Sequence, residues 1–168
     1  VDYQMDGTMW VASSNLDDSY YTVHKSTDHG ESWQQVIRFN SSVCRKDRIG
    51  LVVGEGESAF VHIFLISTMQ SGNLYLSRYT LDGQHHTEFE VLAGPEVVNN
   101  LLVCRDYSGD DYWLYAIAGD EQNINYDEPF ARSTDYGRTW AVLDTFRYAM
   151  GGHLAAGAGS WLYVTYGT

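Results

Sequence analysis

Two nearly identical segments carry the acidic residues that first suggest chemistry. Residues 25–33 read KSTDHGESW and residues 132–140 read RSTDYGRTW. An Asp beside a His, as at Asp28 and its neighbour, is a pair that can exchange protons in catalysis. In a tight turn, however, an Asp accepts hydrogen bonds from backbone N–H groups, which lowers its pKa and makes it a poor proton donor. We therefore interpret Asp28 and Asp135 as structural residues.

The other positions shared by the two segments fit a structural turn as well. The glycines can adopt a positive φ without a Cβ clash. The tryptophans open the following strand, where we expect each of them to be buried against a neighbouring sheet. The predicted structural residues are Ser26, Asp28, Gly30 and Trp33 in the first copy, and Ser133, Asp135, Gly137 and Trp140 in the second.

Arginines at related places suggest a ligand site. Lys and Arg together number only ten, yet Arg48 and Arg147 each stand where a repeat is expected to begin its innermost strand. There both can point towards a central pocket, and a guanidinium group binds a carboxylate or an acidic sugar in bidentate fashion. Tyr126 and Asp127, in a nearby loop, complete this candidate site. The alternative is that the arginines pair with the surplus of surface carboxylates.

A long acidic loop over residues 119–129 is a calcium candidate. Its side chains Glu121, Asn123, Asn125 and Asp127 alternate, and oxygen donors of this kind bind Ca²⁺. The loop lacks the glycine and terminal Glu spacing of an EF-hand, so a solvated acidic loop is the alternative. No other cofactor is predicted, because the chain has no nucleophile elbow, zinc-binding His pair, P-loop or dinucleotide-binding glycine motif.

An internal repeat indicates the elements that hold these residues. Asp28 and Asp135 are 107 residues apart, and halfway between them Asp82-Gly83 forms a weaker copy of the turn. Aromatic-rich strand candidates recur with the same period. Four antiparallel strands per repeat of about 50 residues are typical of a β-propeller. The strand candidates cover residues 8–12, 59–64, 112–117 and 160–164, and no segment has a sustained helical period.

The Ser-x-Asp-x-Gly-x-Thr-Trp pattern resembles the Asp box, or BNR repeat, of sialidases, sortilin-like receptors and many secreted bacterial propellers. The resemblance implies an all-β fold whose ligand sites lie on the face opposite the boxes. Sialidases also have an Arg-Ile-Pro motif, for which Arg48-Ile49-Gly50 is an imperfect match because Gly replaces Pro. An enzyme of this family would use a Tyr nucleophile.

The repeat divides residues 1–168 into one partial propeller domain. We expect blades at 5–39, 48–92, 98–146 and 149–168, with thirteen strands, three in the first blade and two in the last. Unpaired edges at both ends favour pairing with another chain. The chain is therefore a fragment of a longer propeller, one half of a ring completed by a second copy, or a small ring closed by its own terminal strands.

Composition narrows the classes of partner. The formal net charge of −12 disfavours nucleic acid and anionic membranes. No apolar run reaches the length of a membrane span, and the start at Val1 suggests a processed or excised protein. Cys44 and Cys104 lack the spacing of a zinc site, and whether they pair stays open.

These observations favour a non-catalytic propeller module that binds protein or carbohydrate. Its expected location is extracellular, at the cell surface or in the periplasm. Self-association or a complementary propeller fragment is the expected means of covering the open ends. The alternative function is a sialidase-like glycoside hydrolase.

Overall fold

Alternating apolar residues and Gly/Asp turns produce a chain built from strands. The computed structural model describes residues 1–15, 20–40, 44–56, 59–67, 73–92, 100–106, 112–119, 127–147, 150–157 and 161–167. Every regular element in these ranges is a β-strand. Accordingly, the described chain holds no apolar helix of membrane-spanning length.

The strands form three four-stranded sheets and one two-stranded sheet, each an antiparallel meander in chain order. The first sheet contains β1 (Asp2–Tyr3), β2 (Met9–Asn15), β3 (Tyr20–Ser26) and β4 (Gln34–Asn40). The second contains β5 (Cys44–Val53), β6 (Val61–Ser67), β7 (Leu74–Tyr79) and β8 (His85–Leu92). The third contains β9 (Asn100–Arg105), β10 (Leu114–Gly119), β11 (Asp127–Ser133) and β12 (Ala141–Arg147), and the fourth β13 (Met150–Gly157) and β14 (Trp161–Gly167).

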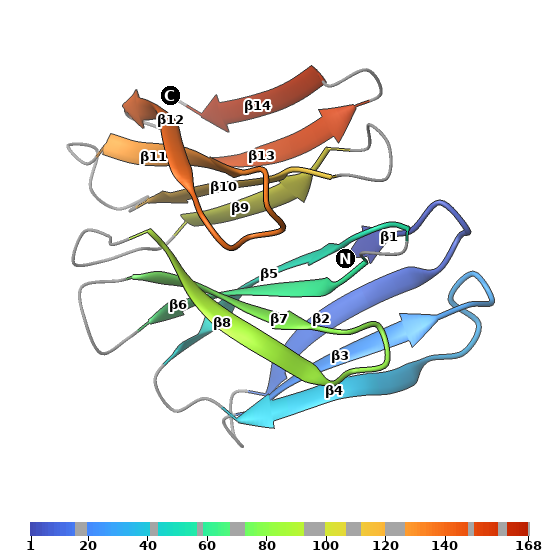
Figure 1. The fold of residues 1–168 in the computed structure, drawn as a ribbon. Helices are drawn as coiled ribbons and strands as arrows, with labels where there is room; N and C mark the ends of the chain where they lie inside the picture. The colour runs from blue at the N-terminus through green and yellow to red at the C-terminus, as the bar shows by residue number, and fades with distance from the viewer. Residues whose placement is uncertain are drawn as a thin grey trace.

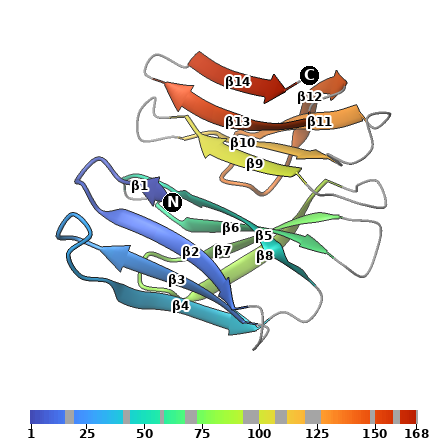
Figure 2. The same ribbon diagram turned by 180° about the vertical axis from the view of Figure 1, so that it is seen from behind.

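The sheets follow one another like the blades of a propeller, from the first sheet at the blue end to the fourth at the red end (Figures 1 and 2). Their first strands approach one another: β5 contacts both β1 and β9, and β9 contacts β13. We call this side of each sheet the inner edge, and the opposite edge, formed by β4, β8 and β12, the outer edge. The predicted all-β fold with four-stranded antiparallel sheets is confirmed.

The core lies between the sheets rather than within one of them. In β6, Val61, Ile63 and Leu65 face the first sheet, whereas Phe64 and Ile66 face the third. Because both faces are covered, all seven residues of β6 are buried. A sheet with two buried faces explains why this segment reads as a continuous apolar run instead of an alternating one.

The predicted count of thirteen strands is wrong, because the first sheet contains a short inner strand that makes fourteen in the described ranges. The buried guanidinium of Arg105 holds β1 in place: its Nη2 donates to the carbonyl of Tyr3 at 2.8 Å and to Glu55 at 2.9 Å. The backbone N–H of Val53 donates to the carboxylate of Asp2 at 2.7 Å. A strand of two residues has no periodicity in the sequence, and the structure defines it by its pairing with β2 together with these distant contacts.

Candidate functional site

Asp28 closes the turn between β3 and β4. Its carboxylate accepts hydrogen bonds from the backbone N–H of Ser32 at 2.9 Å, the hydroxyl of Ser32 at 2.5 Å and the hydroxyl of Ser26 at 2.7 Å. The Ser26 hydroxyl oxygen in turn accepts from the N–H of Gly30 at 2.8 Å. Gly30 has a φ of 90°, as its place in the turn requires. All of these contacts stay within the turn.

The turn between β11 and β12 repeats this arrangement. Asp135 accepts from the N–H of Thr139 at 2.9 Å, from the Thr139 hydroxyl at 2.7 Å and from Ser133 at 2.8 Å. Gly137 has a φ of 84°. The weaker copy between β7 and β8 has Thr80 in place of Ser, with its hydroxyl donating to Asp82. All three turns therefore share the hydrogen bond from a Ser or Thr hydroxyl to the Asp carboxylate.

The hydrogen bonds also fix the ionisation of the turn carboxylates. The Ser32 hydroxyl and N–H, followed by the Ser26 hydroxyl, lower the pKa of Asp28 from 3.8 to about 2. For Asp135, burial by itself raises the pKa, but the bonds from Thr139 and Ser133 outweigh it and the pKa is lowered. Both groups are anions at neutral pH, and neither has a proton to donate as a catalytic acid.

Acidification should open the first turn. The pKa of Asp28 in the folded chain, about 2, lies below its ordinary value of 3.8. Its ionised form therefore stabilises the turn above about pH 4, and this contribution is lost as the pH falls towards 2. We expect the Ser32 amide to exchange its hydrogen faster over this range, as followed by NMR, and much less change in Asp28→Asn. A carboxyl group of Asp28 that titrates near 3.8 would contradict the scheme.

The two motif tryptophans lie in different environments. Trp140 is half-buried and packs edge-on against Phe64 of the second sheet, with ring centroids 5.8 Å apart. Trp33, by contrast, is 41% exposed. The expected burial of Trp33 is therefore wrong, because no described strand covers the face of the first sheet that is turned away from the second sheet. Each indole N–H still donates within its own turn, Trp33 to Gly30 at 3.2 Å and Trp140 to Gly137 at 3.1 Å.

The predicted arginine site is not assembled among the described residues. Arg48 lies in the inner strand β5, but Arg147 ends β12 at an outer edge, where its backbone pairs with Asp127. The prediction that Arg147 begins an innermost strand is therefore wrong, since the outer strand β12 extends as far as Arg147. The side chains of Arg48, Arg147 and Asp127 lie outside the described part, as does Tyr126.

The calcium candidate falls largely in the same undescribed region. Glu121, Asn123 and Asn125 are outside the described residues, and of Asp127 only the backbone is described. Elsewhere in the described chain, no three His, Cys, Asp or Glu side chains come together as a metal site.

Cys104 has a free thiol, so it forms no disulfide with Cys44. Burial, reinforced by the negative charges of Asp2 and Asp106, raises its pKa to about 12. A thiol with this pKa is protonated and unreactive at neutral pH.

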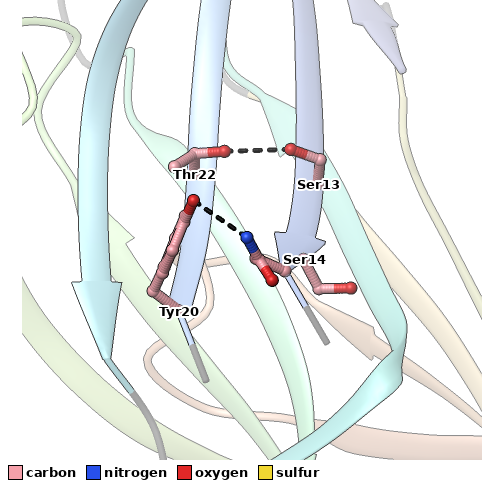
Figure 3. Close-up of a pocket in the computed structure, with 5 residues that line it drawn as sticks. Ser13, Ser14, Tyr20 and Thr22 are labelled. Atoms are coloured by element: carbon pink, nitrogen blue, oxygen red, sulfur yellow. Dashed lines mark hydrogen bonds between the residues drawn. The ribbon is translucent and has the colours of Figure 1, made fainter. Parts of the chain in front are cut away.

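A polar recess of about 450 Å³ lies on the first sheet (Figure 3). The hydroxyl oxygens of Ser13 and Thr22 are 2.9 Å apart, and Asn15 Nδ2 donates to the Tyr20 hydroxyl at 3.0 Å. The guanidinium of Arg38, on the neighbouring strand, lies 4.1 Å from the centroid of the Tyr20 ring. The recess is lined by Ser13, Ser14, Asn15, Tyr20 and Thr22.

The recess marks a difference between the first sheet and the others. Trp10 and Val23 of the first sheet pack against the second sheet. Because side chains alternate along a strand, Val11, Ser13 and Asn15 of β2 lie on the opposite face, which is turned away from the second sheet and is called the outer face below. In the later sheets the face directed towards the preceding sheet is apolar at the corresponding strand. Those residues are Val61, Ile63 and Leu65 in β6, Leu114, Ala116 and Ala118 in β10, and Leu162 and Val164 in β14.

Sequence reasoning missed this recess. The signal was present in the sequence, because residues 11–15 read VASSN, whereas the corresponding strands of the other repeats consist mainly of apolar residues. This difference could be interpreted only once the structure showed which face of the first sheet packs against the second sheet. Hydroxyl, amide and phenol groups in one concavity can exchange hydrogen bonds with a ligand rich in hydroxyls, and the Tyr ring adds an apolar surface.

Comparison with known proteins identifies no family for this chain. The chain is an all-β protein with several four-stranded antiparallel sheets. No protein-family model matches it, and no curated protein matches it.

Proposed function

We propose that the chain is a non-catalytic binding module of the Asp-box propeller type that binds carbohydrate in the recess of the first sheet. The observation that carries the proposal is the polar outer face of β2 and β3, where the other sheets have an apolar face. Ser13, Asn15 and Thr22 would be unfavourable on a face that packs against another sheet, because each polar group buried there would need a hydrogen-bond partner. On a face that binds a ligand rich in hydroxyls, the same hydroxyl and amide groups can exchange hydrogen bonds with the ligand.

Tyr20 and Arg38 define the kind of ligand further. A phenol ring presents an apolar body with a polar tip, which suits the mixed surface of a sugar. Arg38 is exposed and provides a positive charge beside the recess. A sugar that bears a carboxylate could therefore pair with its guanidinium group. The net charge of −12 works against long polyanions. We therefore favour neutral or singly acidic saccharides, and a secreted or cell-surface location where such ligands occur.

Titration with a panel of neutral and acidic mono- and disaccharides, followed by two-dimensional NMR, tests the proposal. We expect shifts concentrated at Ser13, Asn15 and Thr22. Tyr20→Ala should weaken binding about tenfold or more, through lost ring contact and a lost hydrogen bond. Thr22→Val, which removes one hydroxyl while keeping the shape, should weaken it roughly two- to tenfold.

Thr87→Val in β8 is the matched control, because it removes a hydroxyl from another sheet and should leave the affinity unchanged. Shifts that avoid the first sheet, or a Tyr20→Ala variant that binds as the parent does, would overturn the carbohydrate site. If only proteins bind, the proposal of a glycan ligand is wrong. The same preparation should not hydrolyse a fluorogenic sialoside; hydrolysis lost in Arg48→Ala would favour the glycoside hydrolase instead.

A further inference from the structure

We infer that His62 makes the interface between the second and third sheets sensitive to acid: the neutral ring holds the interface closed, and protonation of the ring opens it. His62 alternates with Phe64 along β6, so its side chain lies on the face that packs against the third sheet. Its Nε2 is 2.7 Å from the hydroxyl of Tyr112, which stands just before β10 of the third sheet. This hydrogen bond joins the two sheets.

The interface encloses both rings. His62 is 0% exposed and Tyr112 is 1% exposed, and their rings meet edge-on with centroids 5.6 Å apart. A Cβ on Gly54, the residue after β5, would lie 2.4 Å from the ring and hydroxyl of Tyr112, so the second sheet closes tightly around this side chain. Because no part of the His62 ring reaches solvent, water can deliver a proton to it only when the two sheets separate at this point.

The charges that surround His62 are mainly positive. Arg78 is its cross-strand partner in β7, and Arg105 ends β9 of the third sheet. Both guanidinium groups are almost fully buried, and both act electrostatically on the His62 ring. The carboxylates of Asp2 and Glu55 bind Arg105. A proton on His62 would therefore add a third positive charge to a buried region.

The other titratable groups of this region act on Arg78. Its Nη2 donates to Nδ1 of the exposed His86 at 3.2 Å. Its Nη1 donates to the carbonyl of Tyr136 at 3.2 Å, which is a second polar contact between the two sheets. Two charges in the same turn, Asp135 and Arg138, attract and repel the guanidinium respectively. Within the described chain, the charges that act on the imidazole itself are therefore those of the two arginines.

Hydrogen bonding also opposes a proton on His62. A protonated imidazole donates from both of its nitrogens. Nε2 faces the Tyr112 hydroxyl, but no described group accepts a hydrogen bond from Nδ1. A buried charged donor that lacks an acceptor is unfavourable. Burial, followed by the charges of Arg78 and Arg105, lowers the pKa of His62 from 6.5 to about 3.

This difference in pKa determines the direction and the pH range of the effect. Once the interface opens, water reaches the ring and its pKa returns to about 6.5. Above that pH the ring is neutral in both forms, and the closed form has its full stability. As the pH falls from 6.5 towards 3, only the open form binds the proton, so the closed form loses stability. Between pH 7 and pH 5 the equilibrium constant for opening should rise about 25-fold through this residue alone.

Urea unfolding of the full chain at pH 7 and pH 5 tests the inference, because unfolding also exposes the ring. His62→Gln replaces the imidazole with an uncharged amide that can still form a hydrogen bond with Tyr112. From pH 7 to pH 5, the unfolding equilibrium constant of the parent should rise about 25-fold more than that of His62→Gln. His85→Gln, at an exposed histidine of β8, is the matched control and should follow the parent.

Two NMR measurements on the parent chain locate the effect. The ring signals of His62 should remain those of a neutral imidazole from pH 7 to pH 4. Amide hydrogen exchange, corrected for the intrinsic effect of pH, should report opening at the interface. Between pH 7 and pH 5, Leu114 and Ala116 of β10 should lose more protection than Val23 of β3, which belongs to the first sheet.

Three results would overturn the inference. The first is a His62 ring that titrates near its ordinary pKa in the folded chain. The second is an unfolding equilibrium constant with the same pH dependence in the parent and in His62→Gln. The third is an equal loss of amide protection in β10 and β3. If His62→Gln does not fold, the ring titration and the exchange comparison in the parent chain decide the matter.

Discussion

Gly83→Ala is expected to destabilise the chain by about 2–5 kcal/mol. Gly83 has a φ of +90°, which costs an L-residue about 1–2 kcal/mol. In addition, a Cβ at this position would lie 2.2 Å from the backbone carbonyl oxygen of Val36 in the first sheet. A backbone atom in β4 cannot move aside without disturbing its own strand, so overpacking adds about 1–3 kcal/mol. The midpoint and slope of urea unfolding measure the loss.

Gly30→Ala is the matched control for this prediction. Gly30 has the same φ of +90° in the equivalent turn, but the nearest atom to an added Cβ is the Met9 sulfur at 3.8 Å. This variant should therefore lose only about 1–2 kcal/mol, the backbone cost alone. The difference between the two losses in unfolding free energy measures the contact between the turn at Gly83, in the second sheet, and Val36 in the first sheet. Equal losses would show that this contact contributes nothing to stability.

Trp140→Ala should cost about 2–4 kcal/mol, whereas Trp33→Ala should cost about 1 kcal/mol or less. Trp140 packs on Phe64 of the second sheet and borders the cluster around Leu114, so its removal leaves a cavity between two sheets. Trp33 is 41% exposed and contacts mainly its own turn. Surface substitutions of this kind have small effects.

The same unfolding measurement compares the two tryptophan variants directly. Since both residues occupy the same position of the same motif, the motif itself predicts equal losses. A Trp33→Ala variant as unstable as Trp140→Ala would mean that another surface covers the outer side of the first sheet in solution. That outcome would also argue against a carbohydrate site on this face.

The sequence alone determined the local and repeated features of this protein. The turn chemistry of Asp28 and Asp135 depends on residues at most four positions away, so a motif of nine residues specifies it. The all-β class and the sheets of four strands follow from a period that recurs along the chain. Features of this kind can be predicted because the contacts that create them are short in sequence and occur more than once.

Only the tertiary structure decided which copy of a repeated residue is covered. Trp33 and Trp140 are equivalent in sequence, but Trp140 packs against the second sheet whereas no described strand covers Trp33. Likewise β1, which pairs with β2, is also bound by Arg105, which lies more than a hundred residues away and donates to the carbonyl of Tyr3. The polar recess around Tyr20 depends on which face of the first sheet packs against the second. The free energy of burial depends on the neighbours a side chain meets, and a repeated motif gives each copy the same side chains but not the same neighbours.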